Sequence, residues 1–217
     1  MKRPTMTTMT RTLVLLAGLA AAGATPLAQA GTLPGLTGWT TAGDVLVGSD
    51  SAALITTAAI DSGETPISGR SALLFDALEP ALQLNPGALP GDSYEGSGLV
   101  VQADLAAPVR VSFQWTLSTD SYDAGYLDRG FVAVDGQLFA TLGEVAASPV
   151  GGSFSLLLGA GSHTLALGLF DVNATDLVSR LSISQLSVSA VPEPGTYALM
   201  LGGLAAVAAV ARRRAQR

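Results

Sequence analysis

The sequence predicts an all-β fold, an antiparallel β-sandwich or jelly roll. Two observations in the middle of the chain predict it. Apolar residues alternate with polar ones at a period of two, which is typical of strands that bury one face. Turn-forming residues separate these runs at intervals of about 8 to 12 residues, as in antiparallel sandwiches. We expect this fold over residues 31–190, between an N-terminal signal peptide at 1–30 and a C-terminal signal at 191–217 that contains one short hydrophobic helix.

The clearest strand is the run 109–117, in which apolar residues at every second position share one face. The sharpest turn signal is Asp135-Gly136, between the apolar runs 131–134 and 137–142. An Asp-Gly pair readily adopts the positive backbone dihedral angles of a two-residue type I′ turn, so a β-hairpin is expected there. Further strands are expected at 99–105, 153–158, 163–170 and 181–188, the last with imperfect alternation.

The chain before residue 99 is less regular. Short strands are expected at 44–47, 52–60 and 71–75, and the Pro- and Gly-rich stretch 82–98 reads as a long loop. No amphipathic helix is expected in the ectodomain. Trp115 lies on the apolar face of its strand and is expected in the core, whereas Trp39, in a glycine-rich stretch, is expected at the surface.

The N-terminus has the three parts of a signal peptide. Lys2, Arg3 and Arg11 form a basic region, and residues 13–24 form a short apolar one. Ala28-Gln29-Ala30 then matches the small-x-small pattern of a cleavage site. We therefore expect export and cleavage between Ala30 and Gly31.

The C-terminus has three parts in a fixed order. Pro192-Glu193-Pro194 precedes an apolar run at 196–211, and Arg212, Arg213 and Arg214 follow it. Sixteen residues of helix at about 1.5 Å each span roughly 24 Å, which is short of the roughly 30 Å of a hydrocarbon core. Arginines stay on the cytoplasmic side, so the Pro-Glu-Pro end and all that precedes it would lie across the inner membrane.

This tail resembles the PEP-CTERM sorting signal of exported proteins from Gram-negative bacteria that make extracellular polysaccharide. The resemblance covers about residues 191–217. It implies that an exosortase, a membrane-embedded cysteine transpeptidase-like enzyme, recognises the tail and cleaves it near Pro192-Glu193-Pro194. The alternative is a plain C-terminal anchor. The stretch 113–135, together with the strands at 161–188, also looks like the jelly-roll ectodomains that many PEP-CTERM proteins carry.

The charge of the ectodomain excludes some partners. Residues 31–190 contain sixteen acidic residues and four arginines, a net charge of −12, and no lysine. Such a surface repels phosphate backbones, so nucleic-acid binding is not expected. The chain also has no cysteine, which excludes disulfides, thiolate zinc sites and cysteine nucleophiles.

One loop, at 118–129, has residues that could bind a ligand. Asp120, Asp123 and Asp128 offer the hard oxygens that Ca²⁺ prefers, although their spacing is not that of an EF-hand. Solvated loop acids are the alternative. Tyr122 and Tyr126 could stack on sugar rings or pack the edge of the sandwich with their hydroxyls in water. The acids of the stretch 171–176 could join the cluster if both loops lie at one end of the fold.

No catalytic signature is present. The single histidine, His163, has no Gly-x-Ser-x-Gly partner, and no His-Glu-x-x-His occurs. The leading hypothesis is therefore a non-enzymatic exported protein, transiently anchored in the inner membrane and then sorted to the envelope, the surface or the medium, where it associates with exopolysaccharide. The alternatives are a calcium-dependent carbohydrate-binding module and a glycan-active hydrolase whose paired carboxylates sequence cannot locate.

Overall fold

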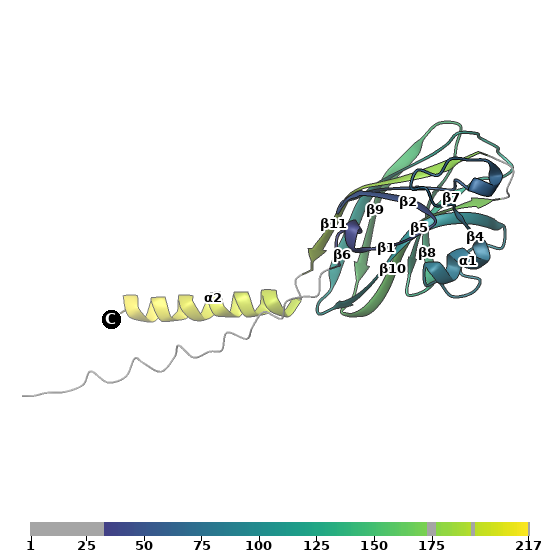
Figure 1. Cartoon of the computed structure of the whole chain (residues 1–217). Helices are drawn as coiled ribbons and strands as arrows, with labels where there is room; N and C mark the ends of the chain where they lie inside the picture. Colours follow the sequence, from purple (N-terminus) through teal and green to yellow (C-terminus); the bar gives the residue numbers. More distant parts are fainter. Residues whose placement is uncertain (1–32, 173–176, 192–193, 217) are drawn as a thin grey trace, which may run out of the picture.

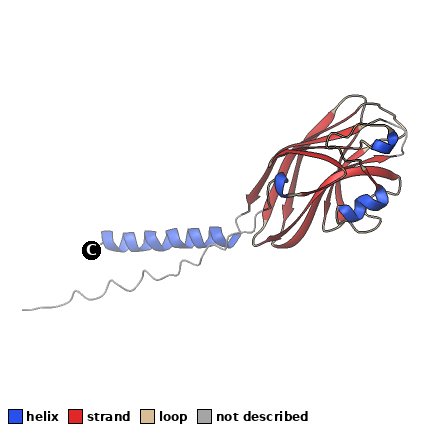
Figure 2. Ribbon diagram, viewed as in Figure 1, coloured by secondary structure: helices blue, strands red, loops and turns tan. Residues whose placement is uncertain are grey.

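Two packed antiparallel sheets form the body of the computed structural model, and one helix extends from them (Figures 1 and 2). The structure describes residues 33–172, 177–191 and 194–216. The predicted signal peptide with Ala28 and Ala30 lies outside the described residues, and so do Pro192 and Glu193. The predicted fold class is confirmed.

Sheet A has the strand order β1-β5-β10-β7-β8, and β4 also pairs with β5. Sheet B has the order β2-β3-β11-β6-β9, and every pairing in both sheets is antiparallel. The strands of sheet A are β1 (Thr40–Ala42), β4 (Leu73–Leu74), β5 (Ser93–Leu105), β7 (Arg129–Val134), β8 (Gln137–Glu144) and β10 (Gly161–Val172). The strands of sheet B are β2 (Asp44–Ser49), β3 (Ala52–Thr56), β6 (Val109–Thr119), β9 (Val150–Leu158) and β11 (Ser179–Ala190).

The main core lies between the sheets, and β6 shows how the sequence builds it. Val109, Val111, Phe113 and Leu117 are buried there, and Trp115 is partly buried against the same core. The residues between them point to the outer face, as their period of two requires. The predicted strand at 109–117 and the inward position of Trp115 are confirmed.

The predicted hairpin is also confirmed. Asp135 and Gly136 have φ values of 52° and 79°, as a type I′ turn requires, and they join β7 to β8. The imperfect alternation of the last strand has a structural reason. The pairing of β11 with β6 shifts between Ser184 and Ser187, where Gln185 takes a φ of 54°, so the strand contains a bulge.

The predictions for residues 71–98 were wrong in three respects. Phe75–Ala81 forms a seven-residue helix, α1, although no helix was expected. Its Leu78, with Leu82 beyond its end, is buried against the outer face of sheet A, where it packs in a second core with Phe131 and Phe170. The expected strand at 71–75 reduces to β4, because Phe75 begins the helix. The expected loop at 82–98 ends early, because β5 already begins at Ser93.

The chain on either side of β2 and β3 also differs from the prediction, and the expected strand at 52–60 is limited to Ala52–Thr56. A short 3-10 helix, η1 (Leu36–Gly38), leads into β1, and a second one, η2 (Ile60–Ser62), follows β3. Trp39 is buried rather than exposed, and its Nε1 donates a hydrogen bond to the carbonyl oxygen of Pro34 at 3.0 Å. The indole N–H thus finds a partner, which allows the ring to enter the core.

The C-terminal helix α2 (Pro194–Ala215) extends away from the sandwich (Figure 1). Its described side chains are exposed, and Arg212, Arg213 and Arg214 lie in its last turn. The predicted short C-terminal helix is thus present. Among the described residues, no helix is both long and apolar enough to cross a membrane.

Candidate functional site

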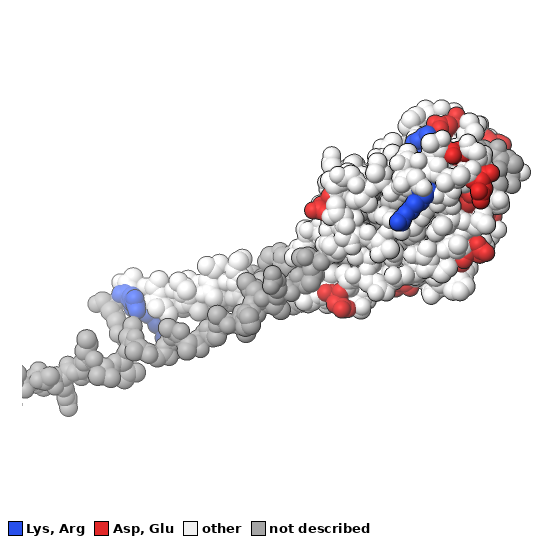
Figure 3. All heavy atoms as spheres, in the orientation of Figure 1, with Lys and Arg blue, Asp and Glu red and all other residues white. Residues whose placement is uncertain are grey.

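The two ends of the sandwich differ in their attachments. At one end, β11 runs toward the C-terminal helix, and the N–H of Val191 bonds the carbonyl oxygen of Pro108 just before β6. We call the opposite end, where Thr57, Asp120 and Val178 lie, the distal end; the N–H of Thr57 bonds Ser179 and that of Asp120 bonds Val178 there. Figure 3 shows many of the acidic side chains gathered toward the part of the sandwich that lies away from α2. The predicted ligand loop at 118–129 therefore points away from the C-terminal signal.

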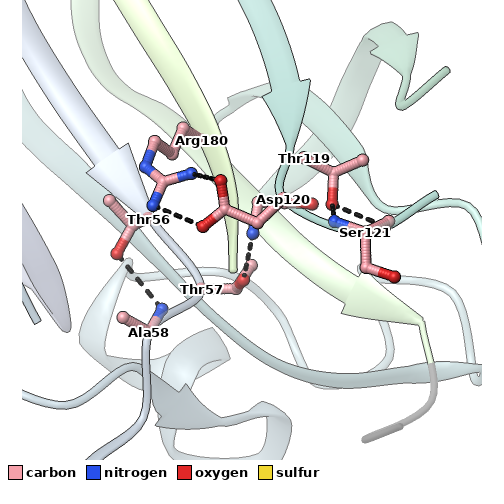
Figure 4. Close-up of polar contacts among 8 residues, drawn as sticks. Thr56, Thr57, Ala58, Thr119, Asp120, Ser121 and Arg180 are labelled. Carbon is pink, nitrogen blue, oxygen red and sulfur yellow. Dashed lines mark hydrogen bonds and ion pairs between the residues drawn. The ribbon is translucent and has the colours of Figure 1, made fainter. Parts of the chain in front are cut away.

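Asp120 forms an ion pair rather than joining a carboxylate cluster. Its two oxygens accept hydrogen bonds from Arg180 Nη1 and Nη2 at 2.5 and 2.7 Å (Figure 4). These bonds lower the pKa of Asp120 and raise that of Arg180. The pair links the end of β6 to the start of β11. Asp120 is thus already neutralised by its neighbour.

Asp123 and the two tyrosines shape the exposed part of the same loop. The Asp123 side chain accepts the N–H of Gly125 at 2.8 Å, and its carbonyl oxygen accepts the N–H of Tyr126 at 3.2 Å. Tyr122 and Tyr126 are 47% and 41% exposed, so both rings can be reached from the solvent. Sugar stacking on these rings stays a prediction, because their exposure fits either of the roles considered from the sequence.

Asp128 lies deeper, in a row of three carboxyl groups. Phe170 pairs with Arg129 on one side and with Gly96 on the other, so Asp171 lies between Glu95 on β5 and Asp128, which directly precedes β7. All three carboxyl groups are buried at the distal end of sheet A. We call Glu95, Asp128 and Asp171 the carboxyl row. The sequence did not single out Glu95, whereas it did anticipate that acids after the 163–170 strand would join this loop.

Burial and nearby negative charge raise the pKa of two members of the carboxyl row, Glu95 and Asp128. Burial, followed by the negative charges of Glu64 and Asp128, raises the pKa of Glu95 from 4.5 to about 7. Burial also raises the pKa of Asp128, although hydrogen bonds from Ser179, the Val172 amide and Asp171 oppose the shift. With a pKa of about 7, Glu95 is partly protonated at neutral pH.

The structure does not bring Asp120, Asp123 and Asp128 together as metal ligands. Each has a different partner: Arg180, the Gly125 amide and the carboxyl row. In residues 33–172, 177–191 and 194–216, no group of three Asp, Glu, His or Cys side chains is arranged to hold a metal ion. Calcium binding thus stays a prediction from the sequence without a preformed site.

His163 contacts Asp135, in the turn between β7 and β8. Its Nδ1 lies 3.0 Å from Asp135 Oδ2, and the other oxygen of that carboxylate accepts the N–H of Thr164 at 2.9 Å. Burial disfavours the charge on Asp135, but the bonds from Thr164 and His163 more than offset it and lower the pKa of Asp135. The contact ties the β7–β8 hairpin to β10.

The outer face of sheet B is a second candidate surface, which local sequence patterns did not indicate. Its three central rows of side chains cross β11, β6 and β9, and they contain hydroxyl and amide groups without any carboxylate. Arg110, in the next row, is the only charged residue of β6 and β9. We call this surface the hydroxyl face. It consists of Ser112, Gln114, Thr116, Ser153, Ser155, Ser182, Ser184 and Ser187.

Hydroxyl and amide groups both donate and accept hydrogen bonds. A flat surface of such groups fits a ligand that is itself rich in hydroxyls and carries little charge. The absence of carboxylates matters here because the ectodomain as a whole has a net charge of −12. On this face, an uncharged or anionic polymer meets no local repulsion from side chains.

Comparison with known protein families gives one match in the C-terminal segment. Residues 190–215 match the family described as "PEP-CTERM protein-sorting motif". The chain carries a PEP-CTERM sorting signal. The matched range includes Pro192-Glu193-Pro194, the helix α2 and Arg212–Arg214. The signal implies that the protein is exported and is a substrate of an exosortase.

Other comparisons concern the PEP-CTERM protein's ectodomain. No curated protein matches the chain. Solved structures with a similar arrangement include "CBM4 structure and function", at 12% identity and a TM-score of 0.34, covering 71% of this chain and 96% of that one. The N-terminal cellulose-binding domain of Cellulomonas fimi β-1,4-glucanase C is 12% identical, with a TM-score of 0.36 and coverage of 73% and 92%. TmCBM61 in complex with β-1,4-galactotriose is 14% identical, with a TM-score of 0.29 and coverage of 74% and 99%.

Proposed function

We propose that this PEP-CTERM protein is a non-enzymatic component of the cell surface or extracellular matrix that associates with the exopolysaccharide of a biofilm. The secretion machinery exports it, the C-terminal signal anchors it transiently at the inner membrane, and an exosortase releases it near Pro192-Glu193-Pro194. Arg212, Arg213 and Arg214 keep the end of the tail on the cytoplasmic side before cleavage, because translocating a cluster of arginines is unfavourable.

The observation that carries the proposed association is the composition of the hydroxyl face. In a strongly acidic domain, this face offers hydrogen-bonding groups from three adjacent strands and no carboxylate. A long, flat, hydroxyl-rich polymer can contact several rows at once, and many weak contacts then add up to useful avidity. Calcium has no part in this proposal, since Asp120, Asp123 and Asp128 have other partners.

The absence of enzymatic activity is proposed on two grounds. The sequence lacks the motifs of serine hydrolases and zinc peptidases. The carboxyl row, which contains acids with raised pKa values, is buried rather than open to a substrate, with exposed fractions of 7% for Glu95, 0% for Asp128 and 4% for Asp171. Incubation of the released chain with the host polysaccharide should give no new reducing ends, and their appearance would favour a hydrolase.

Sorting is tested with the full chain in its host. Replacing Arg212, Arg213 and Arg214 by glutamine should change the processing or the location of the protein, whereas replacing them by lysine should not, because the charge is kept. Intact-mass measurement of the recovered protein reports both termini at once. Unchanged mass and location in the glutamine variant would contradict the proposed role of the tail.

Polysaccharide association is tested on the hydroxyl face. Thr116→Glu places a carboxylate in the middle of this face, whereas Thr141→Glu makes the same change at an exposed site on β8 of sheet A. We expect Thr116→Glu to reduce co-sedimentation of the released protein with host exopolysaccharide at least several-fold, with Thr141→Glu close to the wild type. Equal binding by all three proteins would remove the hydroxyl face from the proposal.

A further inference from the structure

The edge strands of the two sheets are not protected equally. An edge strand exposes unpaired backbone N–H and carbonyl groups, and proteins usually blunt such edges by short length, bulges or charged side chains. β1 and β4 have three and two residues, and the pairing of β2 shifts between Val47 and Ser49. The pairing of β8 with β7 shifts at two places, and β8 ends with Glu144.

β9 has none of these protective features. It pairs with β6 over nine consecutive residues, from Val150 opposite Leu117 to Leu158 opposite Val109, without a shift in register. Its sequence, VGGSFSLLL, contains no charged residue and no proline. Nine residues at about 3.3 Å each give a regular edge roughly 30 Å long. Within the part of the chain that the structure describes, no strand pairs with its outer side.

The sequence of β9 is complementary to itself. If two β9 strands pair in antiparallel with Phe154 opposite Phe154, Gly151 lies opposite Leu157 and Gly152 lies opposite Leu156. Leu157 thus meets a glycine on the outer face and Leu156 meets one on the core face, while Leu158 lies opposite Val150. Ser153 then lies opposite Ser155, where two hydroxyls can bond each other across the strands.

Exposed apolar side chains and the lack of acidic residues near β9 also favour a second copy of this chain as the partner of β9. Leu157 on β9 is 55% exposed, and Phe139 on β8, whose ring contacts that of Phe154 with centroids 6.4 Å apart, is 56% exposed. Two molecules of this acidic protein repel each other over most of their surfaces. β6, β9 and β11 contain no acidic residue, so this side of sheet B is where two copies can approach at the lowest electrostatic cost.

We propose that β9 pairs in antiparallel with β9 of a second copy of this chain, so that sheet B continues from one molecule into the next. The pairing is two-fold symmetric and therefore closed. One strand pair buries less surface than the 1,200–2,000 Å² or so of a stable interface, so the association is weak in dilute solution. It becomes significant where many copies are displayed on one surface.

The absence of cysteine from the chain allows a direct test. Host cells that express the full chain with Ser155→Cys are treated with a short bis-maleimide, and covalent dimers are measured on denaturing gels. Ser49→Cys, at an exposed position on the opposite edge strand β2, is the matched control. We expect Ser155→Cys to give at least five-fold more dimer than Ser49→Cys, when both react equally with a mono-maleimide.

Two further substitutions test the strand pairing itself. Adding Ser153→Lys to Ser155→Cys places a charge on each side of the paired edges and should reduce the dimer to the level of the control. Adding Ser182→Lys, on the same face of the central strand β11, should leave the dimer unchanged. Equal dimer from both cysteine sites, no dimer from Ser155→Cys, or cross-linking of Ser155→Cys to a different protein would overturn the proposal.

Discussion

Glu95 should make the stability of this protein fall as the pH rises from about 4.5 to 8. Its pKa is 4.5 when solvated and about 7 in the fold, because the carboxyl group is buried next to Glu64 and Asp128. The folded state therefore holds a proton that the unfolded chain releases near pH 4.5. The stabilisation is complete below pH 4.5 and is lost as the pH rises through about 7. The raised pKa of Asp128 has the same sign and adds to the effect.

The size of the effect follows from the pKa difference. A gap of about 2.5 pKa units at about 1.36 kcal/mol per unit gives an upper limit of about 3 kcal/mol for Glu95. Relaxation of the distal loops and entry of water at high pH reduce this value. We expect the free energy of unfolding to fall by about 1 to 2 kcal/mol between pH 5 and pH 8.

The assay is urea unfolding of the protein recovered from its host, at several pH values, with Glu95→Gln beside the wild type. Glutamine resembles the protonated acid, so the variant should lose most of the pH dependence and be about 1 to 2 kcal/mol more stable than the wild type at pH 8. Asp104→Asn, at an exposed carboxylate on the same strand β5, should change the pH dependence far less, because that side chain lies in water. If Glu95→Gln keeps the wild-type pH dependence, Glu95 is not the group that holds the proton.

Three other substitutions test packing and polar contacts by the same measurement of unfolding. Gly143→Ala should destabilise the fold by about 1 to 3 kcal/mol, because a Cβ there would lie 2.7 Å from the Trp115 ring. Gly91→Ala should be close to neutral, because a Cβ at that position would meet no atom within 4 Å. Equal stability of the two variants would contradict this packing. Asp44→Ala should cost about 2 to 4 kcal/mol, because this buried carboxylate accepts bonds from Thr56, Ile67 and Ser68, and the exposed Asp76→Ala should cost far less. Arg180→Gln should lower the free energy of unfolding by at most about 1 kcal/mol, because the ion pair of Arg180 with Asp120 is partly solvated. This loss of stability should be smaller in high salt. A loss that is independent of salt would argue against an ionic contribution.

Local patterns predicted the strands that have one buried face and one solvated face. The period of two in β6 and the Asp-Gly turn after β7 are such signals, and both were confirmed. The helix α1 escaped prediction because it has seven residues and contains Pro80, so it shows too few turns for a helical period. It is held by the burial of Leu78 against sheet A, a tertiary contact that no short window of sequence reveals.

The register of strand pairing decides which residues are neighbours on the candidate surfaces, and the sequence alone did not supply that register. Glu95, Asp128 and Asp171 are far apart in the chain, and only the order β5-β10-β7 places them in one row. The serines of β11 form an alternating pattern in the sequence. Thr116 on β6 and Ser153 on β9 join them on one face only because β11 pairs with β6 and β6 pairs with β9. Conversely, the spacing of Asp120, Asp123 and Asp128 in one loop indicated a cluster, whereas in the structure Asp120 pairs with Arg180.

The two proposals for sheet B are compatible because of the geometry of strand pairing. Side chains that lie opposite each other in a pair of strands point to the same face of the sheet. Pairing of two β9 strands around Phe154 places Ser153 of one copy opposite Ser155 of the other, both on the hydroxyl face. Self-association therefore extends this face in its own plane and does not cover it. A polymer chain could then contact two copies at once, so weak pairing of the protein and weak binding of the polymer would reinforce each other.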